Sequence, residues 1–244
     1  FSKYQGTGND FVLIDNRKKE IVLSTEQIKF LCDRRFGIGA DGLMLLEAET
    51  GFDFKMVYYN SDGNQSSMCG NGGRCISAFA KRLNLVGDKA NFLAIDGAHE
   101  SVFLNKIIKL HMNDVSGIEK IGNDFYLNTG SPHYVRIVSD LNSFNVVEEG
   151  KKIRYNDRFK EKGTNVNFIE KKENVLHVRT YERGVEDETY SCGTGVTASA
   201  LISSVLNMFE TKDHCSIITP GGNLSVSFKR VSDESFTNVW LEGP

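Results

Sequence analysis

The first half of the chain alternates short apolar stretches with polar turns. Phe11–Ile14 is a continuous apolar run that predicts a buried strand, and residues 52–59 alternate with the period of two that is typical of a strand. Between them, Ser24 followed three residues later by Gln27 predicts a capping box. We expect this box to open a helix that ends before Gly37.

A glycine-rich segment with a leading cysteine follows the second of these strands. After a polar loop at residues 60–63 comes the segment Cys69–Gly73, and then a helix that places Ile76, Phe79, Ala80 and Leu83 on one face. The second half repeats the order. It has a predicted strand at 175–180, a predicted loop at 182–190, the segment Cys192–Gly195, and a helix with one apolar face formed by Ala198, Leu201, Ile202, Val205 and Leu206.

The two halves are related by an almost constant offset. Placing Cys69 on Cys192 gives 192 − 69 = 123, and placing Gly8 on Gly130 gives 130 − 8 = 122. A shared order of strand, loop, Cys-Gly-x-Gly and helix favours a duplication over a chance placement of glycines. We therefore expect two domains, at residues 1–115 and 116–244.

Composition excludes several classes of protein. The 244 residues carry a net charge of −3 with both signs spread along the chain, so a nucleic-acid-binding surface is not expected. No apolar run approaches the ~20 residues that a membrane helix needs. The first residues show no signal-peptide pattern, and five irregularly spaced cysteines do not form a disulfide or zinc framework. A cytoplasmic location without a metal is therefore expected.

The two Cys-Gly-x-Gly segments combine features that suit acid–base chemistry on an amino acid. The first turn of a helix has backbone N–H groups without partners and carries partial positive charge, so it stabilises an anion. A cysteine at the same point is more easily deprotonated. One such helix start in each half suggests a shared cleft, with Cys69 and Cys192 on opposite faces of one α-carbon.

This arrangement predicts inversion of a stereocentre by two bases. One thiolate would remove the α-proton while the other group, a thiol, delivers a proton to the opposite face. Many enzymes use pyridoxal phosphate to stabilise the resulting carbanion. No lysine here has a sequence context that compels a Schiff base, although the sequence does not exclude one. A reaction without a cofactor needs fixed dipoles to hold the developing charge. The backbone N–H groups of Gly70, Asn71, Gly193 and Thr194 are the expected stabilisers of the developing charge. Cys32, Cys75 and Cys215 are expected to be structural.

Eight motifs in order make the chain closely similar to the diaminopimelate epimerase family over nearly its whole length. In the first half they are GTGNDF (6–11), RRFGIGADG (34–42), YNSDG (59–63) and MCGNGGRC (68–75). In the second half they are GSPH (130–133), GTNVNF (163–168), YERG (181–184) and SCGTG (191–195). Each motif alone would be weak evidence for this family, whereas the eight motifs in this order are highly specific to it.

The resemblance implies a fold, a reaction and a set of site residues. The fold is α/β (α+β), with two pseudo-symmetric domains, each a curved, mostly antiparallel sheet or barrel around a central helix, and an active site in the cleft between them. The reaction is the interconversion of LL- and meso-diaminopimelate, for lysine and peptidoglycan precursors, without pyridoxal phosphate or metal. The two bases map onto Cys69 and Cys192, with His133 and Glu182 as helpers that orient or tune the thiols.

The resemblance also assigns the substrate contacts. The expected residues are Asn9, Asn60, Gly70, Asn71, Ser131, Asn165, Glu182, Arg183, Gly193 and Thr194. Arg183 can pair with the distant carboxylate of diaminopimelate, and Glu182 with its ammonium group. The expected partner is thus a small amino acid, and a homodimer is left open.

Three positions depart from the family pattern. Gly42 stands where many members have glutamine, and Ser131 stands where many have asparagine. Members usually continue past Pro244 into a last strand that returns to the first domain. These departures leave open another two-cysteine racemase on the same fold, acting on proline, hydroxyproline or histidine. A protein of a different class, which binds anions or senses redox state without turnover, is the second alternative.

Overall fold

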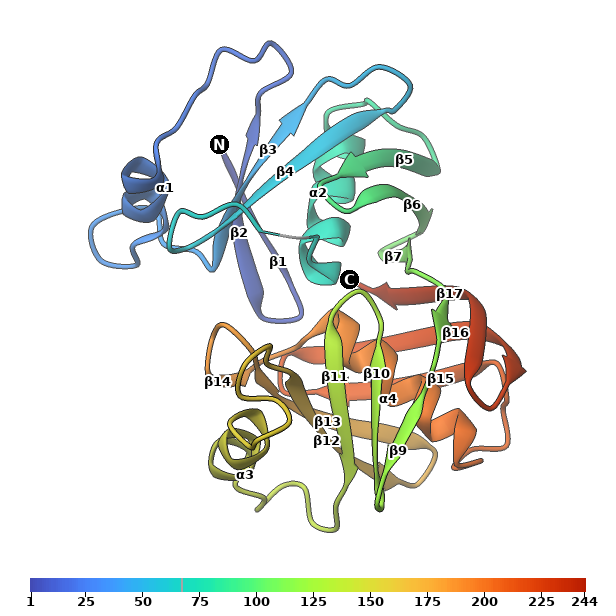
Figure 1. Cartoon of the computed structure of the whole chain (residues 1–244). Coiled ribbons are helices and arrows are strands. Elements are labelled where there is room, and N and C mark those ends of the chain that lie inside the picture. Colours follow the sequence, from blue (N-terminus) through green and yellow to red (C-terminus); the bar gives the residue numbers. More distant parts are fainter. Residues whose placement is uncertain (67) are drawn as a thin grey trace. The chain divides into compact units, whose positions relative to one another are not determined.

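The computed structural model describes residues 1–66 and 68–244, and Figure 1 shows its elements in chain order. By their internal contacts the residues form two compact units. The first unit is Phe1–Leu110 with Pro244, and the second is His111–Gly243. Within the described residues, every helix is too short or too polar to cross a membrane.

The first unit is a single mixed sheet with two helices. Its strands are β1 (Ser2–Gly6), β2 (Asn9–Asp15), β3 (Gly42–Glu47), β4 (Phe54–Asn60), β5 (Lys89–Ala94), β6 (Gly97–Leu104) and β7 (Ile107–His111), and its helices are α1 (Thr25–Cys32) and α2 (Gly70–Arg82). Neighbours along the sheet follow the chain order. The β2–β3 and β4–β5 pairs are parallel, and the other pairs are antiparallel.

Both faces of the first sheet are covered in its β2–β4 region, which is why β3 is apolar and buried from Leu43 to Leu46. One face packs against α1 in a cluster of Val12, Ile28, Cys32, Ala40, Leu43, Leu45 and Val57. On the other face, Met44 and Met56 approach the first turn of α2 at Gly72. The predicted capping box is confirmed, since Ser24 accepts from the backbone N–H of Gln27 and the Gln27 side chain accepts from that of Ser24.

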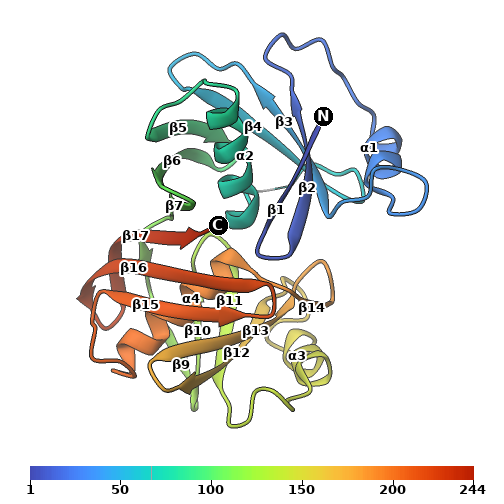
Figure 2. The same cartoon turned by 180° about the vertical axis from the view of Figure 1, so that it is seen from behind.

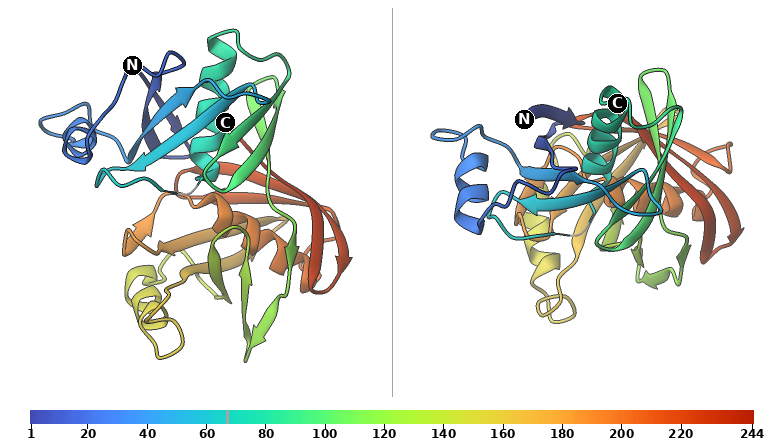
Figure 3. Two further views of the ribbon diagram at one scale, coloured as in Figure 1. Left: turned by 45° about the horizontal axis from the view of Figure 1, so that its top comes forward. Right: turned by 90° about the horizontal axis from the view of Figure 1, so that it is seen from above.

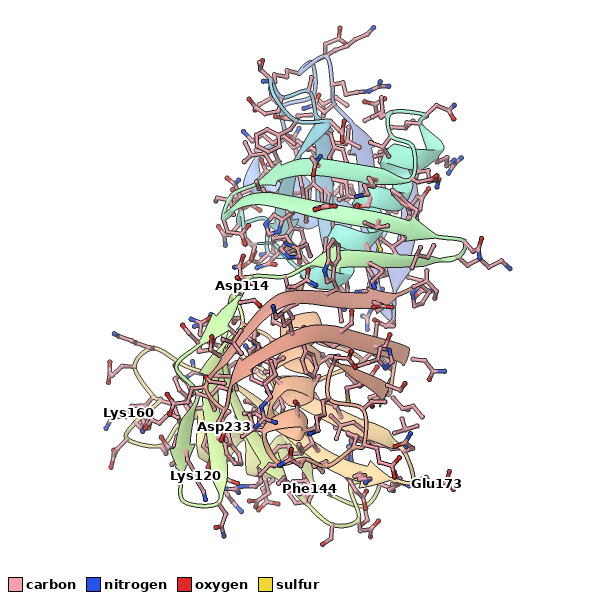
Figure 4. The ribbon with its side chains drawn as sticks, turned by 90° about the vertical axis from the view of Figure 1, so that its right-hand side faces the viewer. Asp114, Lys120, Phe144, Lys160, Glu173 and Asp233 are labelled. Atoms are coloured by element: carbon pink, nitrogen blue, oxygen red, sulfur yellow. The ribbon has the colours of Figure 1, made fainter. Side chains whose placement is uncertain are left out.

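The second unit has the same plan with a few additions. Its strands are β8 (Val115–Ser116), β9 (Glu119–Ile121), β10 (Asp124–Asn128), β11 (Pro132–Ile137), β12 (Asn165–Lys172), β13 (Val175–Glu182), β14 (Asp187–Thr189), β15 (His214–Thr219), β16 (Gly222–Ser232) and β17 (Ser235–Gly243). Its helices are α3 (Val146–Arg154) and α4 (Gly193–Val205). Figure 4 labels Glu173 in the tight turn between β12 and β13, where its φ of +53° lies in the left-handed region.

Helix α4 runs through the interior of the second unit. It contacts β10 to β13 and β15 to β17, and Figure 2 shows it among them from behind. Helix α3 packs against β12, β13 and β14 from outside, as the views in Figure 3 show. Residues of α3 and of the strands that it covers form a separate apolar cluster, which includes Val146, Ile153, Val166, Phe168 and Tyr181.

Strand pairing in the two units supports the duplication. Helices α2 and α4 have the same length, 13 residues each, and begin 193 − 70 = 123 positions apart. In the first unit the parallel pair β2–β3 sets Phe11 opposite Gly42, and in the second β11–β12 sets His133 opposite Asn165. These partners are separated by 122 and 123 positions. The β14 strand, which pairs with the end of β13 and sets Tyr181 opposite Glu188, corresponds in the first unit to a single antiparallel bridge between Tyr59 and Gln65.

Two expectations from the sequence are wrong. The helix expected after the Cys192–Gly195 segment, with one apolar face, is α4, and it is buried on every side from Val196 to Ser204 because strands surround it. Its hydroxyls do not need solvent, since Thr197, Ser199 and Ser203 donate to carbonyls of their own helix. Residues 182–190 were expected to form a plain loop, but the end of β13 and all of β14 lie within them.

Candidate active site

Cys69 and Cys192 occupy the same position in the two units. Each is the N-cap of its helix, in extended conformation, and neither side chain caps the helix. Neither first turn contains an acidic residue. The partial positive charge at each helix start is therefore not neutralised by a carboxylate of its own turn, which suits the binding of an anion.

Asn9 connects Cys69 to a charged cluster in the first unit. The Cys69 thiol donates to Asn9 Oδ1 at 3.6 Å, while Asn9 Nδ2 donates to Asp41 at 2.7 Å. Because a carboxylate only accepts, the amide must present its oxygen to Cys69, and this contact favours the protonated thiol. Arg34 holds the cluster in place through Asp41 at 2.7 Å and Asp10 at 2.8 Å.

A fully buried guanidinium lies one helical turn beyond Cys69. Arg74 donates to Gly70 O at 3.2 Å, Asn71 Oδ1 at 3.1 Å, Thr7 Oγ1 at 3.3 Å and Pro244 O at 3.2 Å. No Asp or Glu side chain within the described part of the chain forms an ion pair with it. Burial lowers the pKa of Arg74, whereas the nearby sulfurs of Cys75 and Cys69 raise it.

The charge of Arg74 and the amide oxygen of Asn9 act on Cys69 in opposite directions. A buried cation favours the thiolate, and the acceptor oxygen favours the thiol. A group that alternates between acid and base needs both forms to be accessible. The second unit has Thr197 at the position matching Arg74, and its hydroxyl donates to Gly193 O at 3.0 Å.

Cys192 lies beside the hydroxyl group of Thr194. Its side chain is 8% exposed, and Sγ is 3.5 Å from Thr194 Oγ1. The backbone of Thr194 is held by Thr129, whose hydroxyl donates to Thr194 O at 2.9 Å. The Thr194 hydroxyl can donate to a thiolate or accept from a thiol, so it suits both forms of Cys192.

His133 is buried and neutral. Its Nδ1 is 3.1 Å from Asn167 Nδ2, and Nε2 has no hydrogen-bond partner among the described residues. Burial, and to a smaller extent the charge of Arg183, lower the pKa of His133 to about 3. Any effect of His133 on a thiol at neutral pH is therefore that of an uncharged imidazole.

Three expected substrate contacts of the second unit are bonded to each other. Asn165 Nδ2 donates to Ser131 Oγ at 3.0 Å and to Pro132 O at 3.1 Å, and its Oδ1 accepts from the backbone N–H of Arg183 at 2.9 Å. Both amide hydrogens of Asn165 are thus used within the protein. The exposed Arg183 guanidinium donates to Lys162 O at 3.0 Å and retains further donors. Glu182 accepts from Thr189 Oγ1 at 2.8 Å.

The remaining candidates of the first unit differ in what they offer. Asn60 ends β4, and its backbone closes the turn to Gly63. Asn71 is fully buried, with Oδ1 accepting from Thr7 and Arg74, so its backbone rather than its side chain lies at the helix start. Sequence reasoning missed Arg74 and Asn167. The signals were a charge within the apolar α2 helix and a second asparagine within GTNVNF.

The other three cysteines are buried and form no disulfide. Burial raises the pKa of Cys32 to about 11, of Cys75 to about 12 and of Cys215 to about 11. Thiols of this kind are not ionised near neutral pH and are poor nucleophiles. The structural role expected for them is consistent with this environment.

Gly72 and Gly195, which match in the repeat, allow a paired test of the two helix starts. A Cβ at Gly195 would lie 2.3 Å from Asn167 Oδ1, and one at Gly72 would lie 2.4 Å from Met44 Cε. The Asn167 amide is held by several hydrogen bonds, whereas Met44 can move its end. We expect Gly195→Ala to cost about 1–3 kcal/mol more than Gly72→Ala in the free energy of unfolding, measured in urea. Equal losses would show that the Asn167 amide is not rigidly held.

Comparisons with known proteins agree with the motifs. The family model described as diaminopimelate epimerase matches residues 1–100 and 125–240. Diaminopimelate epimerase of Flavobacterium psychrophilum is 52% identical over 99% of this chain and 95% of the relative. That of Chlorobaculum tepidum is 42% identical, over 98% and 95%.

The chain belongs to the diaminopimelate epimerase family. Membership makes it an isomerase that acts on a small molecule.

Solved structures show the same fold at low identity. A PhzF-family phenazine biosynthesis protein of Bacillus anthracis has a TM-score of 0.71 at 15% identity, covering 100% of this chain and 92% of that one. A hydroxyproline epimerase of Agrobacterium vitis has 0.69 at 12%, covering 99% and 88%. The expected fold class is confirmed.

Proposed function

We propose that this member of the diaminopimelate epimerase family interconverts LL- and meso-diaminopimelate, with Cys69 and Cys192 as the two bases. The observation that carries the proposal is the duplicated helix start. Two helices of equal length, 123 positions apart, each begin after a cysteine that does not cap its own helix. The fold does not require an ionisable side chain at both places, whereas inversion by two bases requires a group that can exchange a proton at each of them.

The reaction needs one proton to leave and one to arrive. One cysteine, as thiolate, takes the α-proton and becomes a thiol. The other, as thiol, gives its proton to the opposite face of the α-carbon and becomes a thiolate. The product has the inverted configuration, and the two cysteines have exchanged protonation states. The reverse reaction starts from that exchanged state.

The carbanion formed between the two transfers is stabilised by its carboxylate. Its negative charge spreads onto the carboxylate oxygens, which would accept from the backbone N–H groups of Gly70, Asn71, Gly193 and Thr194. These donors belong to fixed helix starts, so little reorganisation is needed as the charge grows. Such preorganised donors are worth about 3–4 kcal/mol each in acyl-transfer enzymes.

The far end of diaminopimelate supplies the specificity. Arg183 has guanidinium donors beyond the one used by Lys162, and it would bind the distant carboxylate. Glu182 would bind the distant ammonium group, with Asn9, Asn60, Ser131 and Asn165 around it. The Asn165 side chain is hydrogen-bonded to Ser131 and to the backbone of Arg183. Its contribution to substrate binding would therefore include holding Arg183 in position.

Two further expectations belong to the proposal. Cys32, Cys75 and Cys215 form no disulfide, which suits a reducing compartment and supports a cytoplasmic location. The oligomeric state is open between monomer and homodimer, and sedimentation of the purified chain measures it directly.

Proton exchange with solvent tests the proposed reaction. LL-diaminopimelate incubated with the chain in deuterated water is expected to yield the meso isomer with deuterium at the inverted carbon. Proline, hydroxyproline and histidine, tested in parallel, are expected to show no exchange, because they lack the second amino-acid group that Arg183 and Glu182 would bind. Absence of exchange with diaminopimelate would reject the proposal. Exchange with proline alone would show that the protein is instead another two-cysteine racemase, which acts on proline.

A further inference from the structure

The inner face of the second unit carries a polar cluster beside the start of α4. His133 lies on β11, Asn167 on β12 and Thr180 on β13, and all three are at most 2% exposed. An added Cβ at Gly195, in the first turn of α4, would lie 3.3 Å from His133 Cε1. The imidazole ring therefore lies against the first turn of the helix that begins directly after Cys192.

Hydrogen bonds fix the orientation of the Asn167 amide. Nδ2 donates to Tyr134 O at 3.0 Å, and Oδ1 accepts from Thr180 Oγ1 at 2.9 Å. A flipped amide would set its oxygen against the Tyr134 carbonyl oxygen, and two acceptors repel. The second hydrogen on Nδ2 then points to His133 Nδ1, 3.1 Å away.

This orientation determines which imidazole nitrogen carries the proton. Since Asn167 Nδ2 can only donate, His133 Nδ1 must accept and is unprotonated. A neutral imidazole carries one hydrogen, which is therefore on Nε2. That N–H is buried and has no partner among residues 1–66 and 68–244. Leaving such a donor unsatisfied costs roughly 1–3 kcal/mol, so its retention needs a reason.

The first unit shows that the fold does not need this cluster. By strand register, Phe11 matches His133, Met44 matches Asn167 and Tyr58 matches Thr180. Phe11 and Met44 are fully buried and apolar, and Met44 approaches Gly72 as Asn167 approaches Gly195. The same position beside a helix start is thus filled in one unit by apolar packing and in the other by a polar pair.

We propose that Asn167 is a positioning residue that fixes His133 as a neutral imidazole with its proton on Nε2. His133 then serves as a hydrogen-bond donor to an anionic acceptor at the start of α4, and it does not transfer a proton itself. The anion is either the Cys192 thiolate or a ligand carboxylate, which share this chemistry. The part of the inference that concerns the anion rests on the proposed function, whereas the tautomer does not.

Nitrogen NMR of the imidazole rings tests the tautomer without any substrate. In protein labelled with ¹⁵N-histidine, His133→Phe identifies the signals of His133 among the five histidines. We expect a protonated Nε2 and an unprotonated Nδ1 that stay unchanged between about pH 5.5 and 8.5. A proton on Nδ1, or a titration in this range, would overturn the inference.

Substitution of Asn167 tests its positioning role. In Asn167→Asp the carboxylate can only accept, so we expect the His133 proton to move to Nδ1 or both nitrogens to be protonated. The same variant should lose at least about 10-fold in kcat, because the donor at Nε2 is lost or the ring becomes charged. Unchanged nitrogen signals, or unchanged kcat with altered signals, would contradict the proposal.

The repeat supplies a control for packing. The double variant His133→Phe with Asn167→Met copies the apolar pair found in the first unit, so we expect it to fold. Its kcat should be low, and equal to that of the single variant His133→Phe, because both lack the donor at Nε2. Wild-type kcat in this variant would show that the polar pair has no role in the reaction.

Two further NMR measurements distinguish the two possible acceptors of the Nε2 hydrogen, the Cys192 thiolate and a ligand carboxylate. A shift of the Nε2 signal in Cys192→Ser points to the thiolate, and a shift on adding diaminopimelate points to a carboxylate. No shift in either arm would reject the donor role. If the wild-type tautomer is as expected but diaminopimelate is not turned over, the proposed function fails and the tautomer assignment stands.

Discussion

Replacing either Cys69 or Cys192 by serine is expected to lower kcat for epimerisation by about 10³-fold or more, with the fold retained. Serine preserves the size and hydrogen bonding of the side chain. Its hydroxyl ionises only at far higher pH, so it cannot act as the base, and it is a much weaker acid than a thiol. Loss of one acid–base group typically costs 10²–10⁴-fold. Steady-state assays from both isomers measure the effect.

The two serine variants should also differ from each other. With one thiol left, proton removal is possible from one face of the α-carbon only, so each variant should exchange the α-hydrogen of one isomer with deuterated water. The isomer exchanged by Cys69→Ser should be the one that Cys192→Ser does not exchange. Exchange of both isomers by either variant would exclude the two-base mechanism.

Cys215→Ser is the matched control for these variants. Cys215 is buried, its sulfur lies 3.7 Å from Ser203 Oγ, and burial raises the pKa of its thiol to about 11. We expect wild-type kcat for this variant. If all three serine variants lose activity equally, the loss reflects folding rather than acid–base chemistry.

Replacing Arg74 by methionine is expected to cost about 3–5 kcal/mol in the free energy of unfolding. The guanidinium is fully buried and donates to Gly70 O, Asn71 Oδ1, Thr7 Oγ1 and Pro244 O. Methionine fills part of the space and leaves these acceptors without a donor, and an unsatisfied buried polar group costs about 1–3 kcal/mol. Urea unfolding of the variant measures the loss.

The same variant should change the reactivity of Cys69. Without the buried cation, ionisation of the Cys69 thiol is less favourable, so its alkylation by iodoacetamide should require higher pH than in the wild type. Arg74→Lys, which keeps the charge but not the geometry, should restore the pH dependence of alkylation more than the stability. An unchanged alkylation profile in Arg74→Met would show that Arg74 is only structural.

The matching position in the second unit provides the control for Arg74. Thr197→Val removes a single hydroxyl that donates to Gly193 O, and we expect a loss of about 1 kcal/mol with Cys69 alkylation unchanged. A loss as large as that of Arg74→Met would mean that the first turn of either helix is equally sensitive to any change.

The sequence alone determined the features that depend on neighbouring residues in the chain. The capping box at Ser24, the strand at Phe11–Ile14 and the two helix starts after Cys69 and Cys192 are set by interactions within a few positions. The duplication was visible for the same reason, because each copy keeps its local order of strand, loop and helix. The motifs in that order also gave the family.

The tertiary structure decided the features that depend on pairing between distant strands. Asn167 reaches His133 and Tyr134 because β11 and β12 are parallel neighbours, although Asn167 and His133 lie 34 positions apart. The burial of α4 on every side depends on strands that surround it, and the hydroxyls of Thr197, Ser199 and Ser203 gave no sign of this. The neutrality of His133 and the isolated charge of Arg74 follow from burial, which local sequence does not specify.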